Sequence, residues 1–123
     1  MSKLLLTFLT FQTQLRMYHW STKKYNRHIE SGNLYEKIDT LIDQFMETLQ
    51  GKLGPVTYKK AMLKLRSTSD SAIIGDMNRF KVFLSRDIEL YLNRFSHMNN
   101  DLQNIRDEML GAVNRSLYLF TLH

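Results

Sequence analysis

The 123-residue chain contains no cysteine and only one proline. Without thiols it has neither disulfide bonds nor thiolate zinc sites, so any metal ion would need nitrogen and oxygen ligands from His, Asp or Glu. No apolar run approaches the roughly 18 residues that span a bilayer. The N-terminus also lacks the long apolar stretch and small-residue cleavage site of a signal peptide. We therefore expect an intracellular, cytoplasmic protein without a membrane segment.

The length of the chain limits it to a single domain over residues 1–123, because a second hydrophobic core would need about another hundred residues. Its 17 basic and 12 acidic side chains give a net charge of +5, which attracts polyanions. Four basic residues gather mid-chain, at Lys59, Lys60, Lys64 and Arg66. No aromatic platform accompanies them, so a solvated surface and a weak polyanion or nucleic-acid contact both remain open.

Apolar residues recur at alternating steps of three and four along four segments, which is typical of amphipathic helices. The four apolar seams run from Leu4 to Tyr18, from Leu34 to Leu49, from Ile73 through Leu84, Ile88 and Tyr91 to Phe95, and from Leu102 through Ile105 to Leu119. The predicted helices span residues 2–20, 33–50, 70–96 and about 101 to the C-terminal region. No segment shows the alternation of a β-strand, so the sequence predicts an all-α fold.

The connection between the second and third predicted helices is the longest of the chain. Gly51, Gly54 and Pro55 stop the second helix, and about 19 residues follow before Asp70. Such a long loop is unusual in a compact domain, and residues 58–65 contain enough helix formers to predict a short helix within it. We expect this crossover to join two parallel helices, which gives a ferritin-like four-helix bundle.

Between residues 19 and 47, two histidines and three regularly spaced carboxylates form a possible cluster. His19 ends the first predicted helix, and His28 lies in the polar turn that follows. Asp39, Asp43 and Glu47 recur at intervals of four on the second helix. These are ligand types that Fe(II) and other hard or borderline metals accept. The cluster is therefore a candidate metal site, and the alternative is a charged, solvated surface.

The angular positions of these residues around their helix axes place them on different faces. At 100° per residue, the three carboxylates lie opposite the apolar face of their helix, whereas His19 falls at the edge of the apolar seam of the first helix. The acidic residues therefore face either solvent or a second subunit. A metal site built from this cluster would have to be shared between two chains.

The cluster resembles the motif of Dps-type miniferritins in the ferritin-like superfamily. His19-Trp20 matches the His-Trp pair that ends their first helix, and His28 matches their second histidine. Asp43 and Glu47 match their carboxylate pair in spacing. The resemblance implies a homo-oligomer, at least a twofold dimer, in which histidines of one subunit and carboxylates of its mate bind iron. It also implies oxidation of Fe(II) by peroxide or oxygen, with Trp20 packed beside the site.

The chain departs from the Dps pattern in two places. The interval from His19 to His28 is about three residues shorter, and Gly32 stands where an acidic ligand is expected four residues after the second histidine. Asp39 is the available replacement for that ligand. The C-terminal segments 104–108 and 117–122 look similar to small uncharacterised proteins of large DNA viruses and phages, which would place the chain in a host cytoplasm.

Two other functions remain open. Glu36-x-x-Asp39 and Asp107-Glu108 resemble the Mg²⁺-binding motifs of all-α nucleotide pyrophosphatases, although Gly111 stands where another carboxylate is expected. A non-catalytic interaction protein that has lost its metal chemistry would explain the missing acidic ligand. Enzymatic activity, including that of a ferroxidase, is therefore left undecided by the sequence.

Overall fold

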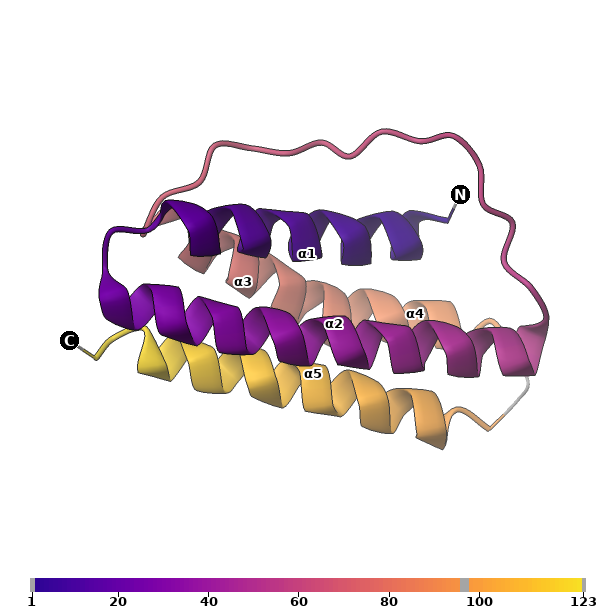
Figure 1. Cartoon of the computed structure of the whole chain (residues 1–123). Coiled ribbons are helices and arrows are strands. Elements are labelled where there is room, and N and C mark those ends of the chain that lie inside the picture. The colour runs from indigo at the N-terminus through magenta and orange to yellow at the C-terminus, as the bar shows by residue number, and fades with distance from the viewer. Residues whose placement is uncertain (1, 96–97, 123) are drawn as a thin grey trace.

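A computed structural model describes residues 2–95 and 98–122, and over these residues the protein is all-α without strands (Figure 1). The helical segments are α1 (Lys3–Ser21), α2 (Tyr25–Leu53), α3 (Ala72–Val82), the π-helical turn η1 (Phe83–Asp87), α4 (Ile88–Leu92) and α5 (Asn100–Leu119). Because α3, η1 and α4 follow one another without a break, they form one rod. The described residues thus form four long helical rods, as the sequence predicts.

The four rods pack side by side in an order set by the long crossover. α2 returns beside α1, and the chain then crosses back along α1 so that α3 runs parallel to α2 (Figure 1). α5 returns antiparallel to the α3–α4 rod. α2 packs against α1 and α5, and the third rod packs against the same two helices. The predicted crossover between parallel helices is confirmed.

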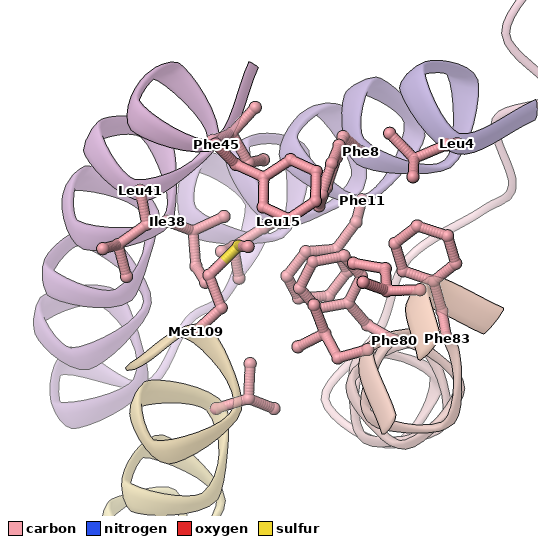
Figure 2. Close-up of a cluster of buried hydrophobic side chains, with 14 of the residues drawn as sticks. Leu4, Phe8, Phe11, Leu15, Ile38, Leu41, Phe45, Phe80, Phe83 and Met109 are labelled. Carbon is pink, nitrogen blue, oxygen red and sulfur yellow. The ribbon is translucent and has the colours of Figure 1, made fainter. Parts of the chain in front are cut away.

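Aromatic side chains fill the centre of the bundle (Figure 2). The buried seams of α1 and α2 are those predicted: Leu4, Phe8, Phe11, Leu15, Tyr18, Leu34, Ile38, Leu41, Ile42, Phe45 and Leu49. The Phe8 ring meets Phe45 and Phe83 edge to face, at centroid distances of 5.3 and 5.4 Å. Each such pair contributes about 0.5–1.5 kcal/mol beyond burial of its area. These contacts hold α1 against both α2 and η1.

The π-helical turn changes which residues of the third rod face the core. The predicted seam runs from Leu84 through Ile88 to Tyr91 and Phe95, but Leu92 is buried in place of Tyr91. A π-helical turn inserts one extra residue, so the buried face moves on by one position. The helix predicted over residues 70–96 begins at Ala72 and its last helical residue is Leu92, while residue 96 lies outside the described residues.

Arg106 of α5 supports this turn from inside the bundle. Its side chain is buried, and its Nη1 donates a hydrogen bond of 3.1 Å to the carbonyl oxygen of Leu84 in η1. Its Nη2 lies 2.6 Å from Glu89 Oε1 on α4. The predicted fourth seam placed Ile105 in the core, whereas Arg106 is the more buried of the two. The buried guanidinium thus ties α5 to the irregular part of the third rod.

Two predictions about the connections are wrong. α2 begins at Tyr25 rather than near residue 33, so His28 lies in its first turn. Residues 58–65 form no helix, because residues 54–69 run as an extended strap along α1 (Figure 1). The strap must cross nearly the whole bundle, and eight residues cover about 26 Å when extended but only about 12 Å as a helix. These residues are therefore extended, although their sequence favours a helix.

Candidate functional site

His19 near the end of α1 and His28 at the start of α2 lie face to face. Their ring centroids are 4.2 Å apart and the planes differ by 11°. His19 Nδ1 lies 2.8 Å from the carbonyl oxygen of His28, and His28 Nδ1 lies 2.9 Å from that of His19. A carbonyl oxygen only accepts, so each Nδ1 carries the hydrogen. In the neutral imidazoles, each Nε2 lone pair is then free to bind a metal ion.

The short turn between α1 and α2 produces this arrangement. α1 ends at Ser21 and α2 begins at Tyr25, which brings the last turn of one helix against the first turn of the next. The carbonyl of His19 lies in the last turn of α1, where carbonyl groups lack partners within the helix. His28 supplies that partner. Ser31 is buried below the pair and donates to the His28 carbonyl at 3.2 Å.

Gly32 provides the space that the His19 ring occupies. A Cβ atom at Gly32 would lie 2.8 Å from His19 Cε1 and 3.3 Å from Nδ1. Any side chain at this position would therefore clash with the imidazole unless the ring moved. The acidic ligand that the Dps pattern places at residue 32 does not fit while His19 holds this position.

The three carboxylates of the cluster are exposed on α2, as helical phase predicts. Asp39 accepts a hydrogen bond of 2.7 Å from Gln12 Nε2 on α1, whereas Asp43 and Glu47 lie on the following turns. Within residues 2–95 and 98–122, no three His, Asp or Glu side chains converge as a metal-binding group. One chain thus brings the two histidines together but does not bring the carboxylates to them.

Trp20 lies near the end of α1, and its side chain is 70% exposed. The guanidinium of Arg16 lies 5.8 Å from the Trp20 ring centroid and 4.2 Å from that of Tyr35. The outer face of the α1–α2 pair therefore carries a cation and two aromatic rings next to the histidines.

A polar network that the sequence analysis missed holds the same end of the bundle. Tyr18 donates to Asp70 Oδ1 at 2.7 Å, and Thr22 donates to the same oxygen at 2.9 Å. Arg27 Nη1 donates to the Tyr18 hydroxyl, and its Nε donates to the Phe120 carbonyl. The Tyr18 hydrogen bond lowers the pKa of Asp70, and burial raises the pKa of Tyr18. The network joins α1, α2, the turn between the strap and α3, and the C-terminal end of α5.

The acidic residues of the pyrophosphatase pattern lie in separate places. Glu36 and Glu108 line a shallow groove between α2 and α5. Asp39 faces Gln12 of α1, and Asp107 accepts a hydrogen bond of 2.7 Å from Arg106 Nε. Within the described residues, at most two of these acids lie close enough together to bind the same metal ion.

The basic residues of the strap fall into two groups. Lys59, Lys60, Lys64 and Arg66 are all exposed, as expected of a cationic surface. Lys64 and Arg66 also line a cleft that the strap forms with α1 and α3. Lys52, on the preceding helix, lies 3.0 Å from Asp101 Oδ1.

The sequence matches the model of a protein family. No helix in the described part of the chain is both long enough and apolar enough to cross a membrane. No curated protein and no solved structure matches the sequence. Residues 19–120 match the model of DUF5856, a family of unknown function, and this range includes both histidines, Gly32 and the three carboxylates. The chain therefore belongs to the DUF5856 family.

Proposed function

We propose that this protein binds Fe(II), or another divalent metal, at a site shared by two copies of the chain. His19 and His28 come from one copy, and Asp43 and Glu47 come from its twofold mate. The observation that supports this is the histidine pair, in which two backbone carbonyls fix both rings and leave both Nε2 atoms as ligands. Metal-binding histidines commonly donate their other ring N–H to such an acceptor.

Distance along α2 requires the second copy. His28 and Asp43 are 15 residues apart on this continuous helix, or about 22 Å along its axis. Ligand atoms lie about 2.0–2.2 Å from a metal ion, so these two residues of one chain cannot bind the same ion. A twofold interface places the same surface of both copies in contact. The exposed Arg16, Trp20 and half-buried Tyr35 beside the histidines would be covered by such an interface.

The resemblance to Dps-type miniferritins supports iron as the substrate. The observed order of four helices with one long crossover is the topology that ferritin-like bundles use. Ionised carboxylates and neutral imidazoles are the ligand states that such a site requires. In the proposed ferroxidase reaction, each of two Fe(II) ions loses one electron, and hydrogen peroxide takes up both electrons with two protons to give two water molecules. Asp39 also lies on this face of α2, one turn before Asp43.

The proposal is tested by anaerobic titration with Fe(II), and with Co(II) as a spectroscopic probe. We expect about one metal ion per chain, because a twofold dimer holds two equivalent sites. His19→Ala/His28→Ala and Asp43→Asn/Glu47→Gln should each abolish stoichiometric binding while leaving the helical circular dichroism unchanged. Glu36→Gln/Glu108→Gln is the matched control, because it removes two acids from the α2–α5 groove. Unchanged binding in either of the first two variants would contradict the site.

A non-catalytic interaction protein is the second candidate. Its support is three exposed aromatic side chains on segments that meet where α1 ends, α2 begins and α5 ends. Trp20, Tyr25 and Tyr118 are 70%, 78% and 63% exposed. Exposed apolar patches of this kind often mark protein contacts. A purified protein that is both metal-free and monomeric, and that stays so after Fe(II) addition, would favour this function over metal binding.

A further inference from the structure

A cleft of about 470 Å³ lies between α1, α3 and the strap, away from the histidine pair. Along α1 it follows one helical face from Lys3 to Gln14, which is about 16 Å long. Strap residues within the range 62–66 form its outer wall, and α3 residues within 76–80 form its inner wall. The volume lies within the roughly 300–1,000 Å³ that is typical of small-molecule sites.

Two glutamines fix the strap to the helices, one in this cleft and one near the start of the strap. Gln14 is 4% exposed and accepts a hydrogen bond of 2.7 Å from the backbone N–H of Arg66. Its Nε2 lies 3.4 Å from Asp76 Oδ2 on α3, so this side chain links the strap to both helices. Farther along the strap, Gln50 accepts from the backbone N–H of Val56 and from the Tyr58 hydroxyl, each at 3.1 Å. The cleft is therefore a built feature and not a gap under a loose loop.

The residues that line the cleft include apolar side chains and positively charged side chains without an acidic partner in the described part of the chain. Leu6, Phe11 and Phe80 contribute apolar surface, and the last two stack at a centroid distance of 3.9 Å. Lys3, Lys64 and Arg66 contribute positive charge. Among the described residues, no carboxylate lies within ion-pair distance of these three cations.

The fourth cation of the lining is already neutralised. Arg79 forms an ion pair with Asp76, three residues earlier on α3. The free positive charge therefore belongs to the strap and to the first turn of α1. A ligand that enters from the strap side meets cations at the rim and apolar groups inside.

We propose that this cleft binds an amphiphilic anion, namely a linear hydrocarbon chain with a carboxylate or phosphate head group. The hydrocarbon chain lies along the face of α1 that lines the cleft, beside Leu6 and Phe11, and the head group pairs with Lys64 and Arg66. An extended chain matches a cleft that follows a helix for about three turns. Charge-assisted hydrogen bonds from Arg and Lys to carboxylate or phosphate are among the stronger polar contacts. The site uses the α1–α3 side and does not depend on metal binding.

The position of the remaining strap lysines argues against a nucleic-acid ligand as the main occupant. Lys59 and Lys60 are exposed on the same strap but are not part of the cleft lining. A polyanion bound to the outer strap would use all four cations, whereas a ligand inside the cleft uses only Lys64 and Arg66. This difference supplies a matched pair of charge-reversal variants.

The test is isothermal titration of the full chain with decanoate and decyl phosphate, each below its critical micelle concentration. Decyltrimethylammonium, acetate and inorganic phosphate serve as probes that lack the negative charge or the chain. We expect binding of at least one of the two anionic amphiphiles and none of the three controls. Equal binding of decyltrimethylammonium, or binding of neither decanoate nor decyl phosphate, would overturn the proposal.

Two variants locate the binding. Lys64→Glu/Arg66→Glu should weaken binding at least about tenfold, whereas Lys59→Glu/Lys60→Glu carries the same charge change and should have little effect. Thr10→Trp should fill the cleft and abolish binding without changing charge, with Thr13→Trp as its control outside the lining. Equal losses in the two charge-reversal pairs would show a diffuse polyanion surface and refute the cleft. Circular dichroism confirms that each variant remains helical.

Discussion

Replacing Gly32 with alanine tests whether His19 is fixed against α2 as the structure shows. In a helix interior, alanine is favoured over glycine by about 1 kcal/mol. Gly111 in α5 is the reference, because an added Cβ there meets no described atom within 4 Å. Gly111→Ala should therefore stabilise the fold by about 1 kcal/mol. At Gly32 the same methyl group would lie 2.8 Å from His19 Cε1, so the imidazole must move.

The cost of moving the imidazole follows from its contacts. The hydrogen bond from His19 Nδ1 to the His28 carbonyl contributes about 0.5–1.5 kcal/mol. The stacked ring pair contributes roughly another 0.5–1.5 kcal/mol. Set against the gain in helix propensity, these losses leave Gly32→Ala between neutral and about 2 kcal/mol less stable than the parent. It should be about 1–3 kcal/mol less stable than Gly111→Ala.

Urea unfolding followed by circular dichroism measures these differences. In a His19→Ala background the clash is absent, so Gly32→Ala should there gain about 1 kcal/mol, as at Gly111. We therefore expect Gly32→Ala to stabilise the protein that lacks His19 but not the parent protein. If Gly32→Ala stabilises the parent protein as much as Gly111→Ala does, the imidazole is not held where the structure places it. The claim that backbone contacts hold the two histidines in place for metal binding would then lose its support.

Two further predictions concern the contacts that hold the bundle. Asp70→Asn should lose about 1–2 kcal/mol of stability near neutral pH, because Tyr18 and Thr22 lose a charged acceptor. The Tyr18 hydrogen bond lowers the pKa of Asp70 below 3.8, so this contribution is present above that value and is lost as pH falls through the native pKa. Urea unfolding at a series of pH values should show the two proteins converging below about pH 4, and a constant gap would contradict the assignment. Arg106→Met should lose about 2–4 kcal/mol, because Leu84 and Glu89 lose a donor in a largely buried place. Arg86→Met breaks the exposed pair with Asp87 and should change stability by less than about 1 kcal/mol in guanidinium unfolding, so similar losses in both variants would refute the buried role of Arg106.

Periodicity predicted the parts of the fold that depend on local sequence. The seams of α1 and α2 and the parallel crossover follow from spacing and from stop residues, and the structure confirms them. The shift from Tyr91 to Leu92 did not follow, because it arises at a π-helical turn, whose Leu84 carbonyl accepts a hydrogen bond from Arg106 of another helix. The missing strap helix was also beyond local sequence, since the distance that residues 54–69 must cross is set by the finished bundle.

The sequence predicted which helix face carries the residues of the candidate site, but not which atoms these residues contact. The outward direction of Asp43 and Glu47 follows from 3.6 residues per turn. The stacking of His19 on His28 depends on a turn of three residues and on two backbone carbonyls, which sequence spacing does not reveal. Gly32 was interpreted as a missing ligand, whereas the structure shows that it makes room for the His19 ring.

The shared metal site is tested most directly by mixing two inactive variants. His19→Ala/His28→Ala lacks the imidazoles, and Asp43→Asn/Glu47→Gln lacks the carboxylates, so neither should bind Co(II) or Fe(II) alone. After unfolding and refolding together in equal amounts, half of the dimers should contain one chain of each kind and therefore one intact site. We expect the mixture to regain about a quarter of the parent's metal stoichiometry, as random pairing in a twofold dimer requires. No recovery in a mixture whose mass shows mixed dimers would contradict a site shared between copies.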